Sequence, residues 1–162
     1  MSPQFIAKSL AAFMLTLCAV SGLAQMPNPY GLSISLDNAK KVAAPALAEA
    51  AKNNWTMAVA VVDTGGNLVY FEKIDNTQIG SANFAIEKAR SAASFKRPTK
   101  AFQETLAAGG DGLRVLGIHG AVPSEGGIPI LIEGKIVGAI GVSGGTSQQD
   151  GQCAKAGAEA LK

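Results

Sequence analysis

The stretch GGIPILIEGKIVGAIGVSGGTSQQD, residues 126–150, decides the fold of this chain. Seven of its residues are glycine, yet they stand among Ile, Leu and Val, a composition typical of neither a flexible linker nor an ordinary strand. The pattern predicts two strands, at residues 128–132 and 135–142, because both are short apolar runs bounded by turn residues. Glu133 and Gly134 between them fit a two-residue turn, so the stretch is expected to form a β-hairpin.

The glycines of this hairpin need a physical reason. Gly138 and Gly141 each cost a strand roughly 0.5–1 kcal/mol relative to alanine. Either a helix or a neighbouring subunit packs very close to the sheet there, or a flat ligand lies against it, and close packing is the favoured explanation. Gly144 and Gly145 follow the second strand, where backbone N–H groups from Ser143 onward would point outward and hold a carboxylate or phosphate.

The rest of the chain predicts helices and a second hairpin. Apolar residues recur at helical spacing in several segments, and residues 63–67 supply a turn between two runs of β-formers. The predicted helices lie at residues 35–52, 81–95, 99–106 and 149–161, and the strands of the second hairpin at 55–62 and 68–72. Because strands come in adjacent pairs rather than alternating singly with helices, the expected fold class is α+β, an antiparallel sheet covered by helices.

Two details of these helices are expectations in their own right. In the second predicted helix, Glu87, Lys88 and Arg90 are expected to face away from the apolar stripe. Ser147 and Asp150 have the spacing of a capping box for the last helix.

The first residues have the pattern of a secretory signal peptide. Lys8 precedes an uncharged apolar run at 10–20, and small residues follow up to Ala24, after which cleavage is expected. The alternative is a buried N-terminal helix, but the run has no polar face, and it is too short to span a membrane. The expected organisation is a signal peptide at residues 1–24, an extended lead-in at 25–34 and a single domain at 35–162, in a periplasmic or secreted protein.

Composition argues against several classes of function. The formal net charge is +2 with both signs interleaved, whereas a nucleic-acid surface would show a basic stripe. No segment after the leader is long and apolar enough to cross a membrane. His119 is the only histidine, and no Cys-x-x-Cys-His motif exists for covalent haem attachment. Cys153, the only cysteine after the leader, is expected to be a small buried hydrophobe.

Three motifs in a fixed order resemble a known family. They are AVAVVDTGGNLVYFEKID at residues 58–75, AIEKARSAASF at 85–95 and the glycine-rich hairpin itself. Together they resemble the GlcG/HbpS family, also described as the haem-binding domain at the end of the PduO proteins, over residues 33–162. The resemblance implies a profilin-like, five-stranded antiparallel sheet flanked by helices, and assembly into homo-oligomers, often octamers. It also implies non-covalent haem binding by several members, with iron release or haem degradation for some and cobalamin binding for others.

The leading hypothesis is therefore an exported, oligomeric protein that binds haem or another tetrapyrrole and takes part in haem or iron handling. Haem needs an apolar slot, a cationic grip on its propionates and usually one axial ligand. The candidates for the grip are Lys88, Arg97 and the backbone nest formed by Ser143, Gly144 and Gly145. The first candidate for the iron ligand is His119, followed by Tyr70, Thr99 and Cys153.

Two other functions stay open. An enzyme or binding protein for a small anionic metabolite would use Lys88, Arg97 and Glu125 to line a pocket between subunits. A structural accessory protein would need only an apolar surface that self-assembly covers. No catalytic residue is assigned, and ligand binding is favoured over turnover. Residues 111–125, which include His119, are expected to form a functional loop over the sheet.

Overall fold

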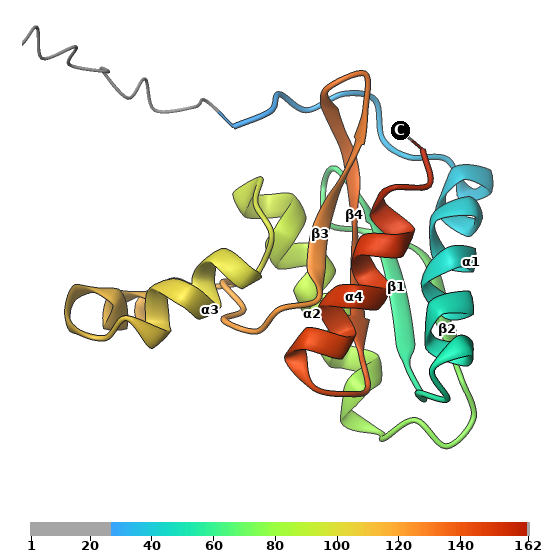
Figure 1. Ribbon diagram of the computed structural model, residues 1–162. Coiled ribbons are helices and arrows are strands. Elements are labelled where there is room, and N and C mark those ends of the chain that lie inside the picture. The colour runs from blue at the N-terminus through green and yellow to red at the C-terminus, as the bar shows by residue number, and fades with distance from the viewer. Residues whose placement is uncertain (1–26, 162) are drawn as a thin grey trace, which may run out of the picture.

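Four antiparallel strands form the sheet at the centre of the computed structural model, which describes residues 27–161 (Figure 1). Their spatial order is β2-β1-β4-β3, so each predicted hairpin supplies one half of the sheet and the halves join where β1 pairs with β4. The strands are β1 Ala58–Asp63, β2 Leu68–Lys73, β3 Gly127–Ile132 and β4 Lys135–Ser143. The signal peptide predicted at residues 1–24 lies outside the described residues.

Helices cover both faces of this sheet. On one face α1 Leu36–Lys52 packs beside α4 Ser147–Ala158, and α2 Gly80–Phe95 covers the other. Figure 1 shows α3 Lys100–Ala107 extending away from the sheet with the 3-10 helix η1 Gly110–Gly117. The predicted α+β class is confirmed. Within the described residues, no helix has the length and apolar character that crossing a membrane requires.

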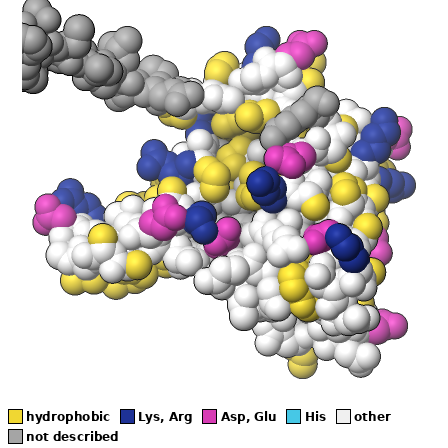
Figure 2. Space-filling model, viewed as in Figure 1, with side chains coloured by type: hydrophobic (Ala, Val, Ile, Leu, Met, Phe, Trp, Pro, Cys, Tyr) yellow, Lys and Arg dark blue, Asp and Glu magenta, His cyan; other side chains and the backbone are white. Residues whose placement is uncertain are grey.

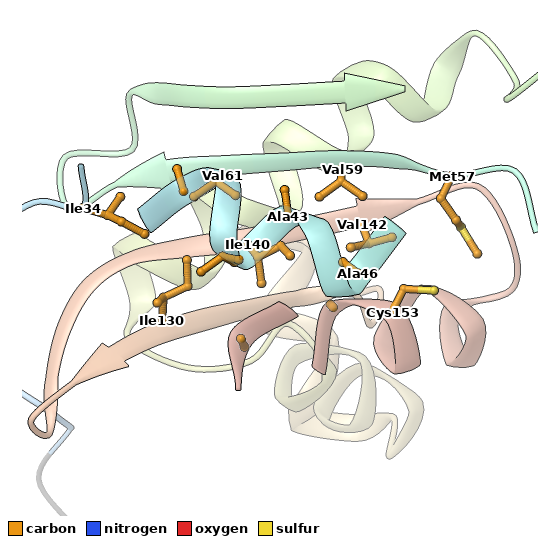
Figure 3. Packing of buried hydrophobic residues seen from close by; sticks show 14 of the residues in the cluster. Ile34, Ala43, Ala46, Met57, Val59, Val61, Ile130, Ile140, Val142 and Cys153 are labelled. Atoms are coloured by element: carbon orange, nitrogen blue, oxygen red, sulfur yellow. The ribbon is translucent and has the colours of Figure 1, made fainter. Parts of the chain in front are cut away.

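The larger hydrophobic core lies between the sheet and the pair α1 and α4. Val59 and Val61 of β1 and Ile140 and Val142 of β4 point toward these helices, whose core residues are mostly alanine (Figure 3). Side chains alternate along a strand, so Ala60 points to the opposite face, where it packs in the cluster under α2. Because β1 is buried on both faces, its sequence AVAVV shows no alternation of polar residues.

The number of strands differs from the prediction: the described residues form four strands, where five were expected. The lead-in pairs with β4 only at isolated points. Tyr30 forms an isolated parallel bridge with Ile136, and Ile34 N–H donates to Val137 O at 2.8 Å, just beyond the point where β1 ends. Pro29 has no N–H to donate, and α1 begins soon afterwards, so this segment does not extend into a full strand.

Local signals placed most turns correctly. Glu133 and Gly134 have φ values of 49° and 72°, as a two-residue hairpin turn with both central residues left-handed requires. The capping box of α4 is at Thr146 and Gln149 instead of the predicted Ser147 and Asp150. The prediction was one residue late because the Asp150 carboxylate has a different partner, described below.

The glycine at the middle of β4 is explained by helix packing. A Cβ atom at Gly141 would lie 2.0 Å from the carbonyl oxygen of Ala85 and 2.6 Å from the amide nitrogen of Ala89, both in the backbone of α2. The helix therefore rests directly on the strand. Of the two explanations that the sequence left open, close packing is the correct one here, and the packed surface is a helix of the same chain.

Replacing Gly141 by Ala is expected to lower the free energy of unfolding by about 1–3 kcal/mol, because the methyl group pushes α2 off the sheet. Chemical denaturation measures the change. The matched control is Gly80→Ala in the first turn of α2, where nothing lies within 4 Å of the added Cβ, and it should leave stability unchanged or raise it by up to about 1 kcal/mol. Equal losses for both variants would contradict the packing described here.

Candidate functional site

A buried ion pair stands where α2, β4 and α4 meet. The side chain of Lys88 on α2 is fully buried, and its Nζ donates to Asp150 Oδ2 at 2.7 Å and to Val142 O at 3.2 Å. The other carboxylate oxygen of Asp150, Oδ1, accepts from Gly145 N–H at 3.0 Å. One side chain thus connects the helix on one face of the sheet to the helix on the other.

Lys88 was expected to face away from the apolar stripe, and this prediction is wrong. Asp150 supplies a counter-charge at the end of β4, so the ammonium group points inward, where the Phe84 ring centroid lies 4.8 Å from Nζ. Burial lowers the pKa of Lys88, while the hydrogen bond and the charge of Asp150 act in the opposite direction. In this arrangement the Lys88 ammonium does not reach an external anion.

Thr99 and Glu125 fasten the arm, which we define as residues 100–117, to the sheet. Buried Thr99 exchanges two hydrogen bonds with Gly127, from its N–H to Gly127 O and from Gly127 N–H to Thr99 Oγ1, both at 2.9 Å. Glu125 Oε2 pairs with Lys100 Nζ at 2.7 Å, and its backbone N–H donates to Gln103 Oε1 at 2.8 Å. Both predicted ligand-binding residues thus have partners within the chain.

Two backbone N–H donors of the predicted anion nest, and the Ser143 side chain beside them, have internal partners. Gly145 N–H donates to Asp150, Thr146 N–H donates to the side chain of Gln149, and Ser143 Oγ bonds to Ser81 Oγ at 3.3 Å. Gly144 packs closely, because a Cβ there would lie 2.1 Å from the carbonyl oxygen of Thr56. The glycines after β4 therefore serve to turn the chain into α4.

Three further candidates are distributed over distant parts of the molecule. Arg97 is exposed after α2, and its guanidinium carbon lies 5.7 Å from the centroid of the Phe102 ring. Tyr70 donates its hydroxyl hydrogen to Glu72 on β2. Cys153 is buried in α4, as predicted, and burial raises the pKa of its thiol to about 11, so it stays protonated at neutral pH.

His119 is the predicted site residue that the structure leaves exposed beside a hollow. It stands at a turn in which Ala121 N–H donates to Ile118 O at 3.1 Å, and Gly120 has the positive φ of 82° that such a turn requires. Val122 N–H then donates to Ser91 Oγ at 3.1 Å, which fixes this loop against α2. The region 111–125 thus consists of most of η1 and a loop that returns along α2.

The hollow beside His119 has a volume of about 390 Å³ and is also lined by Glu87, Arg90 and Val122. A second hollow of about 430 Å³ lies toward the N-terminus of α2, is lined by Phe84 and Ser81 among others, and shares Glu87 with the first. Together they follow the outer face of α2. The sequence did not identify Arg90 as a site residue. Arg90 lies close to His119 only because Ser91 holds the loop of His119 against α2.

No free-ion site accompanies His119. Among residues 27–161, no three His, Cys, Asp or Glu side chains come together in a way that would hold a metal ion. The charged and polar side chains that gather at the hollow are the imidazole of His119, the guanidinium of Arg90 and the carboxylate of Glu87, beside apolar neighbours such as Val122.

Comparison with known proteins shows which family this chain belongs to. The model of the family described as "Haem degrading protein HbpS-like" matches residues 34–159. The chain belongs to the HbpS-like family. The resemblance to GlcG/HbpS proteins that its motifs indicated is thus confirmed.

Relatives agree in sequence and in structure. Protein GlcG of Escherichia coli strain K12 is 38% identical over 110 residues, which cover 68% of this chain and 81% of GlcG. The crystal structure of a Streptomyces reticuli HbpS variant with two Glu-to-Asp substitutions is 30% identical, has a TM-score of 0.74, and covers 97% of this chain and 99% of that one. A crystal structure of a PduOC–haem complex has a TM-score of 0.72 at 22% identity, over 81% of this chain and 96% of that one, which shows the shared fold.

Replacing Lys88 by Met in this HbpS-like protein is expected to lower the free energy of unfolding by about 3–5 kcal/mol, since Asp150 would stay buried without its counter-charge. Denaturant titration measures the loss. The matched control is Lys100→Met, which breaks the ion pair of an exposed lysine with Glu125 and should cost less than about 1 kcal/mol. If both substitutions lowered the free energy of unfolding by the same small amount, the Lys88–Asp150 pair would not stabilise the fold as described here.

Proposed function

We propose that this protein binds haem non-covalently on the outer face of α2, with His119 as the iron ligand. The observation that carries the proposal is that His119 and Arg90 line the same solvent-open hollow. An axial nitrogen ligand and a cation for the propionates are two of the three features that haem requires. The third, an apolar surface, is offered by Val122 in this hollow and by the partly exposed Phe84 in the next one.

The charges of the two hollows favour one orientation of the haem. Arg90 Nε donates to Gly66 O at 3.0 Å, which holds the guanidinium in place while its other N–H groups remain able to bind carboxylates. Glu87, between the hollows, would repel the propionates. The propionates are therefore expected beside Arg90, and the apolar edge of the macrocycle toward Phe84.

The family supports this proposal independently of the geometry. The family model carries the description of a haem-degrading protein, and PduOC, which shares the fold, has been crystallised with haem. The alternative of an anionic metabolite held by Lys88, Arg97 and Glu125 is less well supported, because Lys88 and Glu125 both have partners within the chain.

Titration of the purified protein with hemin is expected to shift the Soret band at micromolar protein. His119→Ala should change the spectrum, because the iron loses its ligand. Arg90→Gln should weaken binding about tenfold, the value of one charge-assisted hydrogen bond. The matched control is Arg114→Gln, because Arg114 lies on η1 and pairs with Asp111. Absence of a Soret shift, or a His119→Ala spectrum identical to that of the wild type, would refute the proposed site.

We also propose that the protein is a homo-oligomer, an octamer as the family resemblance implies, and that the arm forms part of the interface. Leu113 and Leu116 on η1 are 54% and 70% exposed, and Ile118 is exposed beside them. Figure 2 shows hydrophobic side chains along the lower side of the arm, which protrudes from the body of the molecule. A second copy would remove this apolar surface from water.

Leu116→Lys is expected to reduce the assembly to smaller species in native mass spectrometry and size-exclusion chromatography, because a charge at the interface cannot be buried unpaired. Leu32→Lys is the matched control, because Leu32 is 91% exposed on the lead-in, away from the arm. A monomeric wild-type protein, or an assembly that tolerates Leu116→Lys as well as Leu32→Lys, would contradict the interface.

We propose further that the protein is exported to the periplasm or secreted, with residues 1–24 removed. The support is the basic residue, apolar run and small residues of the sequence up to Ala24. The intact mass of protein recovered from the periplasm or medium of a Gram-negative expression host should correspond to a chain that begins at Gln25. Recovery only from the cytoplasm, with the leader intact, would exclude export.

A further inference from the structure

A separate apolar groove runs along the outer edge of β3. Its volume is about 240 Å³; Ile128 and Leu131 of β3 line it together with Ala158 of α4. Two cations, Lys96 after α2 and Lys155 on α4, lie in the same lining. Figure 2 shows hydrophobic surface in a recess of the molecule, with Lys and Arg side chains at its borders.

We propose that this groove binds a small amphipathic monocarboxylate, with the apolar tail against Ile128 and Leu131 and the carboxylate between Lys96 and Lys155. The occupant is a free small molecule, distinct from the haem of the α2 face. The proposal does not depend on haem binding, because the two sites share no residue.

Lys96 is held in position for this role. Its Nζ lies 4.2 Å from the centroid of the Tyr30 ring, and that ring is fixed by a hydrogen bond of 2.7 Å from the Tyr30 hydroxyl to Ala93 O. Lys96 also ends α2 in the left-handed conformation, with φ of 55°, which a glycine would adopt without steric cost. A lysine stands at this position despite that cost, and its side chain lines the groove.

The shape and charge of the groove select the class of ligand. Pro129 in the edge strand has no N–H, so an added peptide strand would lose a hydrogen bond there. The volume is below the ~300 Å³ that pockets for larger ligands start from, which excludes a porphyrin. A dicarboxylate would place its second charge against the apolar lining of Ile128 and Leu131, so a ligand with one carboxylate is favoured.

Octanoate is the probe for this proposal, titrated into the full chain and followed by calorimetry and by amide chemical shifts. A ligand of this size should bind one to one with Kd of about 0.1–1 mM. Octanol, which lacks the charge, and succinate, which has two carboxylates, should bind at least about fivefold more weakly. The double variant Lys96→Asn/Lys155→Gln should lose about tenfold in octanoate affinity, since it removes two partly exposed charge contacts.

The matched control is Lys41→Gln, because Lys41 is an exposed lysine of α1 that does not line the groove. It should bind octanoate like the wild type. The proposal is overturned if octanoate shows no saturable binding up to about 10 mM, if the double variant binds as well as Lys41→Gln, or if succinate competes equally. Hemin binding by the same samples is read separately at the Soret band, so failure of one site does not imply failure of the other.

Discussion

The buried ion pair between Lys88 and Asp150 links the three layers of the molecule. Lys88 comes from α2 on one face of the sheet, and Asp150 comes from the first turn of α4 on the other face. Their Nζ and Oδ2 atoms lie 2.7 Å apart near the end of β4. The contact requires Gly126, where a Cβ would lie 3.0 Å from Nζ and 2.6 Å from Val142 O. The glycine at position 126 thus leaves the space that the Lys88 side chain needs to reach Asp150 past the edge of the sheet.

The packing of α2 around this ion pair determines which of its side chains are exposed on the surface. Because α2 rests on the strand at Gly141 and directs Lys88 inward, the same helix presents Glu87 and Arg90 to the outside, and the Phe84 ring beside Lys88 stays partly exposed. The loop that carries His119 is then fixed to α2 through Ser91. The haem site proposed for this HbpS-like protein is therefore built from one helix face and one anchored loop, on a frame that the ion pair stabilises.

Local sequence patterns predicted the helices and strands of this fold. They did not predict the contacts between residues that are far apart in the sequence. The turn at Glu133 depends on its own φ, so sequence suffices to place it. The pairing of Lys88 with Asp150 joins residues 62 apart, and no helical periodicity reveals it. His119 was identifiable as the only histidine, whereas its neighbour Arg90 was not, because their proximity arises from the fold of the returning loop. A fifth strand was expected from family resemblance, and the lead-in forms only a bridge.

Native-state amide hydrogen exchange tests most directly whether the corner around the ion pair is a rigid frame. The amides of Gly127, Val142 and Gly145 donate to Thr99 Oγ1, Gly126 O and Asp150 Oδ1. We predict that all three exchange only through global unfolding, whereas the amide of Ile118, directly after the arm, exchanges through local opening at a much lower free energy. Exchange of the Gly145 amide as fast as that of Ile118 would contradict the account, because the ion pair would then not hold the layers together.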